Sequence, residues 1–265
     1  MKSNTSRTKT NIKAKLNSFL TRSTGLQIVR ANKTARYPMG LLYEADNDFN
    51  VLYQSASKQT QTPGDSQKRR ARFYDLMQFF GSTQHLSGAM AECGCWKGLS
   101  SLMMCRLLRN NDSSFQGNDY YIFDSFEGLS KPTDEDEITD KDVILRHVIT
   151  HLHGRHFAAS LENVQHALHE FPRIEYLKGW LPQTLQGQPE RLYRFVHVDV
   201  DVYEPTRGCI EYFFPRLVDG GILVCDDYGS LNWPGAKKAV DDYCALHGIR
   251  FVSLSSGSAI MFKDK

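Results

Sequence analysis

From residue 88 onward, short continuous apolar runs alternate with runs in which apolar residues recur every three or four positions. The short runs predict buried strands, and the longer periodic runs predict helices. The predicted strands cover residues 89–93, 120–123, 174–177, 195–198, 221–225, 250–254 and 259–262. The predicted helices cover residues 69–80, 99–108, 161–171, 206–217 and 236–246. This alternation predicts an α/β fold with a parallel sheet that helices cover on both faces.

The two ends of the chain depart from this alternation. The last two predicted strands are joined only by Ser255–Ser258, too short a connection for parallel strands, so they predict an antiparallel hairpin. The polar run Gln54–Gln67 predicts a loop or linker, and residues 12–30 contain enough apolar residues for a short amphipathic helix. We therefore expect a basic arm and linker over 1–68 and one domain over 69–265.

Composition narrows the class of protein. The 265 residues carry a net charge of only +2, which does not favour nucleic acid as a partner. Residues 1–36 hold nine Lys or Arg and no acid, so the body is acidic. No run approaches the ~20 apolar residues of a membrane span, so we expect no transmembrane segment. Six scattered cysteines suit a reducing compartment, and we expect a cytoplasmic protein, with a homo-oligomer left open.

Two features suggest a nucleotide-like cofactor. The glycine-rich turn 92–98 (ECGCWKG) follows the first predicted strand, where glycine lets the backbone approach a ligand and the next helix directs free N–H groups toward it. Such a turn is equally compatible with a purely structural role. Asp124 ends the second strand, the usual position of an acid that accepts hydrogen bonds from a ribose diol. Together the two features favour a cofactor with a ribose.

Four acids follow the next two parallel strands. Asp199 and Asp201 end the strand 195–198, and Asp226 and Asp227 end the strand 221–225. If these strands are neighbours, the four carboxylates crowd together and raise one another's pKa values. Oxygen ligands favour Mg²⁺ over zinc at such a place. The alternatives are solvated acids or a network paired with arginine.

An insert between the second and third strands is rich in charge. Six acids lie within 134–142 and four histidines at 147, 151, 153 and 156, so we expect residues 130–160 to form a lid over the acceptor. One of these histidines could act as a general base. His197, on a buried strand, is predicted to be a hydrogen-bonded core residue.

The order of the motifs is more specific than any single one. The chain has Glu-x-Gly-x-Trp-x-Gly at 92–98, Asp-Ser-Phe-Glu-Gly-Leu at 124–129, Lys-Gly-Trp at 178–180, Asp-x-Asp-x-Tyr at 199–203 and Gly-Gly-x(4)-Asp-Asp-Tyr at 220–228. Over roughly residues 70–250 this order resembles the macrocin O-methyltransferase family. Cys93 and Cys95 depart from the small or β-branched residues that are more usual in the first motif.

The resemblance implies a fold, a cofactor and a metal. The fold is a Rossmann-like, doubly wound, mostly parallel seven-stranded sheet with an antiparallel last strand and a helical N-terminal extension. The implied cofactor is S-adenosylmethionine, held by Glu92, Gly94, Trp96, Ser100, Asp124, Ser125 and Phe126. The implied metal is Mg²⁺, with Asp199, Asp226 and Asp227 as its ligands. Asp201 lies beside these ligands. Asp199 and Asp201 are the candidate catalytic residues, with either Asp201 or a lid histidine as the general base.

The resemblance also implies an O-methyltransferase that acts on a sugar hydroxyl. Chelation by the metal requires adjacent hydroxyls, so the expected acceptor is a small molecule or glycan with a vicinal diol. A catechol-like phenol is the alternative acceptor. The rival functions are an NAD-dependent oxidoreductase and a binding protein without activity. The absence of a GxGxxG motif and the presence of the acid cluster favour methyl transfer over hydride transfer.

Overall fold

The computed structural model describes residues 42–137 and 157–264, which belong to one compact unit. The helix predicted at 12–30 and the four histidines of the expected lid lie outside the described residues. In the described part of the chain no helix is long and apolar enough to cross a membrane.

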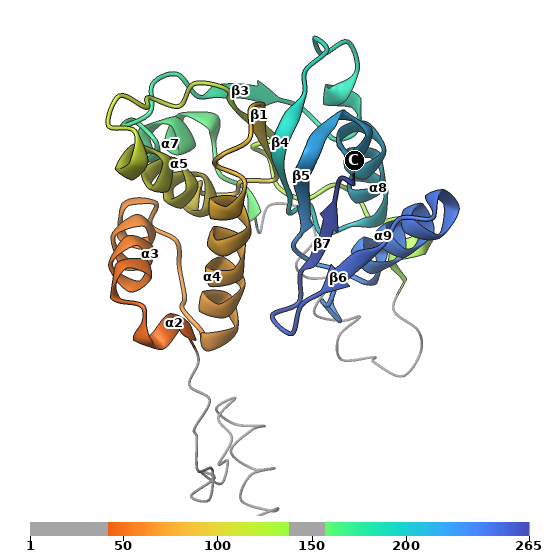
Figure 1. Ribbon diagram of the computed structural model, residues 1–265. Coiled ribbons are helices and arrows are strands. Elements are labelled where there is room, and N and C mark those ends of the chain that lie inside the picture. Colours follow the sequence, from red (N-terminus) through yellow and green to blue (C-terminus); the bar gives the residue numbers. More distant parts are fainter. Residues whose placement is uncertain (1–41, 138–156, 265) are drawn as a thin grey trace, which may run out of the picture. The chain divides into compact units, whose positions relative to one another are not determined.

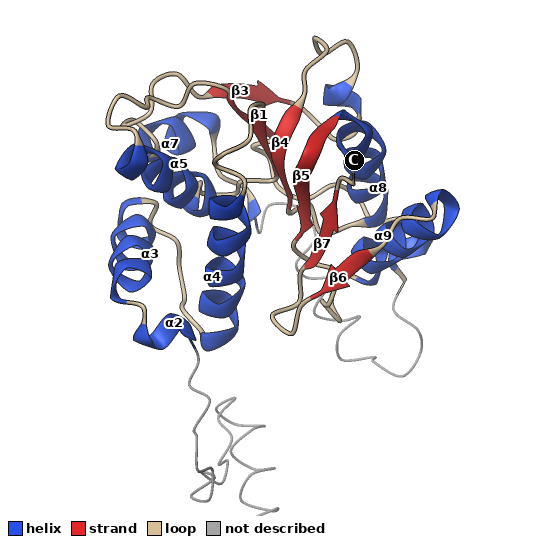
Figure 2. Ribbon diagram, in the orientation of Figure 1, coloured by secondary structure: helices blue, strands red, loops and turns tan. Residues whose placement is uncertain are grey.

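A seven-stranded sheet forms the centre of this body, in the order β3-β2-β1-β4-β5-β7-β6. The strands are β1 (Ala89–Cys93), β2 (Tyr120–Asp124), β3 (Glu175–Lys178), β4 (Tyr193–Val198), β5 (Leu217–Cys225), β6 (Phe251–Ser253) and β7 (Ala259–Phe262). Only β7 runs antiparallel to its neighbours, β5 and β6. The predicted doubly wound sheet with an antiparallel last strand is confirmed, and Figure 2 shows it between its helices.

Helices cover both faces of the sheet, as Figure 1 shows. They are α2 (Leu42–Ala45), α3 (Asn47–Gln59), α4 (Gln67–Ser82), α5 (Leu99–Asn111), α7 (Leu161–Ala167), α8 (Tyr203–Phe213) and α9 (Pro234–His247). Alternate residues of β1 enter different cores, because successive strand side chains point to opposite faces. Met90 packs with α3, α4 and α5, while Ala91 and Cys93 pack with residues of α8 and α9. The sheet is thus buried on both sides.

Helix α3 corrects one expectation. The prediction of a loop over 54–67 is wrong for residues 54–59, which complete α3. Asp46 begins this helix by accepting a hydrogen bond from the Phe49 backbone N–H at 2.9 Å. Phe49, Tyr53 and Ala56 then bury one face. These three buried residues have helical spacing. Only Ala56 falls within residues 54–59, which are otherwise polar, so the helical periodicity was not evident there.

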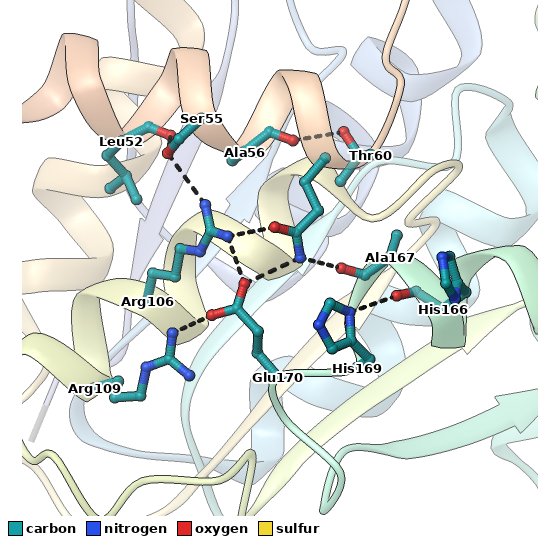
Figure 3. Close-up of polar contacts among 11 residues, drawn as sticks. Leu52, Ser55, Ala56, Thr60, Arg106, Arg109, His166, Ala167, His169 and Glu170 are labelled. Carbon is teal, nitrogen blue, oxygen red and sulfur yellow. Dashed lines mark hydrogen bonds and ion pairs between the residues drawn. The ribbon is translucent and has the colours of Figure 1, made fainter.

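A charged network joins α3 to the sheet domain (Figure 3). Arg106 on α5 donates hydrogen bonds to Gln59 Oε1 at 2.6 Å and to Glu170 Oε1 at 2.5 Å. Arg109, one turn further along α5, pairs with the other oxygen of Glu170. Gln59 Nε2 also donates to the Ala167 carbonyl at 2.8 Å. One carboxylate after α7 therefore links α5 with the last residue of α3.

We expect Glu170→Gln to lower the stability of the body by about 2 kcal/mol at neutral pH. Hydrogen bonds from Arg106 and Arg109 outweigh burial and lower the pKa of Glu170 to about 2, from 4.5. Its stabilising contribution is therefore complete above pH 4.5 and is lost as the pH falls from 4.5 toward 2. Urea unfolding between pH 3 and pH 7 measures this dependence.

The matched control is Glu190→Gln, which removes an ion pair with Arg216 from a side chain that is 81% exposed. We expect the control to change stability by less than about 0.5 kcal/mol. Equal stability of the Glu170 and Glu190 variants at neutral pH would contradict a role of the network in holding α3.

Candidate functional site

The carboxyl ends of the four central parallel strands lie along one edge of the sheet. Hydrogen bonding continues one residue beyond three of these strands, with Gly94 N donating to Phe123 O at 2.9 Å, Asp199 N to Cys93 O at 2.8 Å and Asp226 N to Val198 O at 2.9 Å. The glycine-rich turn and the acid pairs are thereby brought together. Strands β4 and β5 are direct neighbours, as the crowding of their acids required.

A cavity of about 380 Å³ lies at this edge. Most residues that the sequence singled out line it: Gly94, Trp96, Ser100, Asp124, Ser125, Asp199, Asp201 and Asp227. Three others, Glu92, Phe126 and Asp226, do not line it. The cavity joins the glycine-rich turn to the acids of β4 and β5, so two reactants could meet in it.

Asp124 organises the turn side of the cavity. Its Oδ2 accepts hydrogen bonds from the backbone N–H groups of Cys95 at 2.7 Å and Trp96 at 3.3 Å, and its Oδ1 accepts one from Phe126 at 2.6 Å. Burial raises the pKa of Asp124, although these N–H bonds oppose the shift. Trp96 and Phe126 have backbone φ angles of +47° and +56°, which residues other than glycine rarely adopt. The single carboxylate therefore holds two strained residues in place.

Gly94 brings the turn against the acid cluster. Its φ is +81°, and a Cβ at this position would lie 2.0 Å from the carbonyl oxygen of Asp199. Only glycine satisfies both the backbone conformation and the close approach. The distance between the turn and the end of β4 is thus determined by the absence of a side chain.

Three of the four acids face one another across the cavity floor. Burial and the neighbouring charge of Asp199 raise the pKa of Asp201 to about 8. Burial and the charge of Asp201 likewise raise the pKa of Asp227. Asp227 is 4% exposed, and its buried Oδ2 has no hydrogen-bond partner among the described residues. An unpartnered carboxylate oxygen among other carboxylates suits a divalent cation.

Asp226 has a different environment, because Arg72 of α4 forms an ion pair with its Oδ2. Its Oδ1 accepts a hydrogen bond from Ser258 at 3.2 Å and lies 3.9 Å from Nε2 of His197. Ligand atoms of His197, Asp199 and Asp226 lie within 4.8 Å of one another. The arginine-paired alternative therefore holds for one acid of the cluster.

His197 connects this cluster to Glu92 beneath the cavity. His197 is 1% exposed, and its Nδ1 lies 2.9 Å from Glu92 Oε1, so the predicted hydrogen-bonded core histidine is confirmed. Glu92 itself is 0% exposed and also accepts hydrogen bonds from Ser101 and from the Tyr120 hydroxyl. Every described contact of the Glu92 carboxylate is with the protein core, rather than with the cavity.

Sequence reasoning missed several residues of the cavity wall. Lys68, Arg69 and Arg72 reach the cavity from α4, and Trp233 lines it from the loop after β5. The only available signal was the basic run 68–72 at the start of a predicted helix. Charge at the start of a helix usually means solvent exposure, so the run gave no reason to place it at the site.

Part of the expected lid is fixed rather than free. Asp136 closes a short 3₁₀ turn over Asp134–Asp136 and is 8% exposed. Its Oδ1 accepts a hydrogen bond from the Tyr203 backbone N–H at 2.8 Å, at the start of α8. The described beginning of the insert is therefore anchored just beyond the acids of β4.

Comparison with known proteins adds independent information. Among curated proteins, the chain is 30% identical over 166 residues to the 8-demethyl-8-(2,3-dimethoxy-alpha-L-rhamnosyl)-tetracenomycin-C 4'-O-methyltransferase of Streptomyces olivaceus, covering 61% of this chain and 60% of that protein. It is 27% identical over 169 residues to the demethyldecarbamoylnovobiocin O-methyltransferase of Streptomyces niveus, covering 62% of this chain and 61% of that protein. The chain thus matches about three fifths of the length of these relatives.

Solved structures share the fold. The O-methyltransferase NovP superposes with a TM-score of 0.59 at 23% identity, covering 73% of this chain and 80% of its own. CalS11, a calicheamicin methyltransferase, superposes with a TM-score of 0.58 at 17% identity, covering 82% and 93%. A family model described as macrocin-O-methyltransferase (TylF) matches residues 66–253. This match spans well over half of the chain, which therefore belongs to the macrocin-O-methyltransferase family.

Proposed function

We propose that this protein is an S-adenosylmethionine-dependent O-methyltransferase whose acceptor is a hydroxyl of a sugar or of a glycosylated natural product. The observation that carries the proposal is the single cavity shared by the Asp124 turn and the acids of β4 and β5. Methyl transfer needs both parts of this cavity, one for the methyl donor and one for the acceptor, because the acceptor oxygen must lie in line with the bond from the donor to the methyl group. Family membership and the names of the curated relatives support the same activity.

The cofactor would occupy the turn side of the cavity. Gly94, Trp96 and Ser100 line the wall at the start of α5, where a helix presents its first backbone N–H groups. Asp124, held by three N–H bonds, would accept hydrogen bonds from the ribose hydroxyls, and Ser125 lies next to it on the wall. S-adenosylmethionine supplies an electrophilic methyl group on a sulfonium. Phe126 and Glu92, which lie behind the wall, would support this side without touching the cofactor.

The acid cluster fits Mg²⁺, with Asp199, Asp226 and Asp227 as the residues that would hold it. The fit rests on oxygen donors and on the buried, unpartnered Oδ2 of Asp227. A bound Mg²⁺ supplies Lewis acidity and fixes the orientation of adjacent hydroxyls. Asp201 lines the cavity and would accept the proton of the attacking hydroxyl at its carboxylate. The ion pair with Arg72 would hold the Asp226 carboxylate in its orientation toward the other acids of the cluster.

All six cysteines are free thiols, and all are buried. Free thiols without disulfides suit a reducing compartment, which supports the proposal of a cytoplasmic location. The acceptor would be a small molecule or glycan, and light scattering tests whether identical chains associate.

Calorimetry with S-adenosylmethionine, S-adenosylhomocysteine and NAD tests the cofactor. We expect the first two to bind and NAD not to bind. A methyl-transfer assay then compares acceptors with and without a vicinal diol, including a catechol. Tight NAD binding without S-adenosylmethionine binding would favour an oxidoreductase, and cofactor binding without transfer to any acceptor would favour a binding protein.

We expect Asp124→Ala to weaken S-adenosylhomocysteine binding at least about tenfold, because it removes a charged acceptor worth about 1.5–3 kcal/mol. It also releases the strained turn residues Trp96 and Phe126. Isothermal titration gives the dissociation constant. The control is Asp112→Ala. It removes an exposed carboxylate that does not line the cavity and that accepts a hydrogen bond from the Ser114 N–H at 2.9 Å. Equal affinities of the two variants would contradict the role of Asp124.

A further inference from the structure

Three basic side chains line the cavity without an acidic partner. Lys68 and Arg69 belong to the first turn of α4, and Lys97 to the turn between β1 and α5. Within residues 42–137 and 157–264, none of the three has a carboxylate within ion-pair distance. The neighbouring Arg70 and Arg72, by contrast, pair with Asp65 and Asp226. The body is acidic overall, so unpaired cations at this cavity need an explanation.

Neutral carbonyl groups hold two of these cations in place. Arg69 Nη1 donates to the carbonyls of Pro63 and Gly64, both at 2.7 Å. Lys97 Nζ donates to the carbonyl of Gln61 at 2.9 Å. A carbonyl oxygen orients a cation but does not neutralise its charge. The connection between α3 and α4 therefore preorganises two charges that remain available to a ligand.

The face of α4 toward the cavity carries positive charge at two positions along the helix. Arg72 follows Arg69 by three residues and Lys68 by four, so each of the two lies on the same face of α4 as Arg72. At about 1.5 Å rise per residue, Lys68 and Arg72 are about 6 Å apart along the helix axis. Arg72 reaches the acid cluster, while Lys68 and Arg69 lie one turn away. The cavity thus has an acidic floor and a separate basic part.

We propose that the basic part binds a phosphate group of the acceptor, so that the substrate is a phosphorylated sugar rather than a neutral glycoside. This inference rests on the proposed function, since the sugar hydroxyls would lie at the acid cluster. Within the described residues the Arg69 guanidinium has no ion pair, and its planar set of donors matches two oxygens of a phosphate. Lys97, and the more exposed Lys68, add point charges. A diphosphate linked to a nucleoside and a simple sugar phosphate share this chemistry.

The test titrates the full chain, saturated with S-adenosylhomocysteine, with glucose 1-phosphate, uridine diphosphate and methyl glucoside. We expect at least one phosphate probe to bind about tenfold or more tightly than methyl glucoside. The better of the two phosphate probes then distinguishes a sugar phosphate from a nucleotide-linked sugar. We expect Arg69→Gln and Lys97→Gln each to weaken phosphate binding about tenfold, with S-adenosylhomocysteine affinity unchanged.

Arg70→Gln is the matched control, because Arg70 is the next residue on α4 but pairs with Asp65 and does not line the cavity. It should leave phosphate binding unchanged, and melting curves verify that all three variants are folded. Phosphate probes that bind no better than methyl glucoside would overturn the inference. A loss of S-adenosylhomocysteine binding in Arg69→Gln and Lys97→Gln, with phosphate binding intact, would also overturn it and assign these cations to the cofactor carboxylate. Failure of the wild type to bind S-adenosylhomocysteine at all would instead defeat the proposed function.

Discussion

Replacing Asp227 or Asp199 by asparagine should abolish methyl transfer, with a loss of at least about a hundredfold in kcat. Each change removes a negative oxygen from a cluster proposed to hold Mg²⁺, and the Lewis acidity of a bound metal is worth several kcal/mol of barrier, with about 1.4 kcal/mol for each factor of ten. Neither residue belongs to the Asp124 turn, so S-adenosylhomocysteine affinity should stay within about threefold. The measurement pairs steady-state kinetics with calorimetry of the same preparations.

A chelator provides the complementary test. Excess EDTA should reproduce the loss in the wild type, and added Mg²⁺ should restore activity to the wild type but not to the variants. Asp219→Asn is the matched control, because Asp219 lies on β5, the strand that leads into Asp226 and Asp227, but is exposed to solvent. Full activity of the wild type in excess chelator would refute the metal, and equal loss in Asp219→Asn would show that the effect is not specific to the cluster.

The convergence of these acids could be predicted because it follows from topology. Apolar strands that lead directly into Asp199 and Asp226 place both at the carboxyl edge of a parallel sheet, and adjacent strands bring them together. The ion pair of Asp226 could not be predicted in the same way. Its partner Arg72 lies on a helix more than 150 residues earlier in the chain, and no local pattern relates that helix to β5.

Strand prediction located the part of the cavity wall that consists of strand ends. Gly94 and Asp199 directly follow β1 and β4, and Asp124 is the last residue of β2. Lys68 and Arg69 reach the same cavity from α4, whose placement depends on packing between helices rather than on the sheet. A basic run on a helix has the same sequence pattern whether it faces water or a cavity, so its role emerged only from the tertiary structure.

Glu92 illustrates a motif residue whose role changes once its surroundings are known. The resemblance implied that Glu92 holds the cofactor, yet its carboxylate contacts Ser101, Tyr120 and His197, and the residue is 0% exposed. A buried carboxylate with three hydrogen-bonding partners contributes to stability, and its removal leaves those partners unsatisfied. We therefore propose that Glu92 acts on the cavity indirectly, by holding β1, β2, α5 and β4 together.

We expect Glu92→Ala to lower the free energy of unfolding by about 3–5 kcal/mol and Glu92→Gln by about 1–3 kcal/mol. Glutamine keeps the size and one acceptor but loses the charge that faces His197, so it separates electrostatics from the loss of packing. S-adenosylhomocysteine affinity of folded Glu92→Gln should stay within about threefold of the wild type. Urea unfolding and calorimetry give the two quantities, with the exposed strand residue Glu175→Gln as the control. An unchanged unfolding free energy together with a tenfold loss of cofactor affinity would instead make Glu92 a direct contact of the cofactor, because a residue that acts only through the core cannot weaken binding without first weakening the fold.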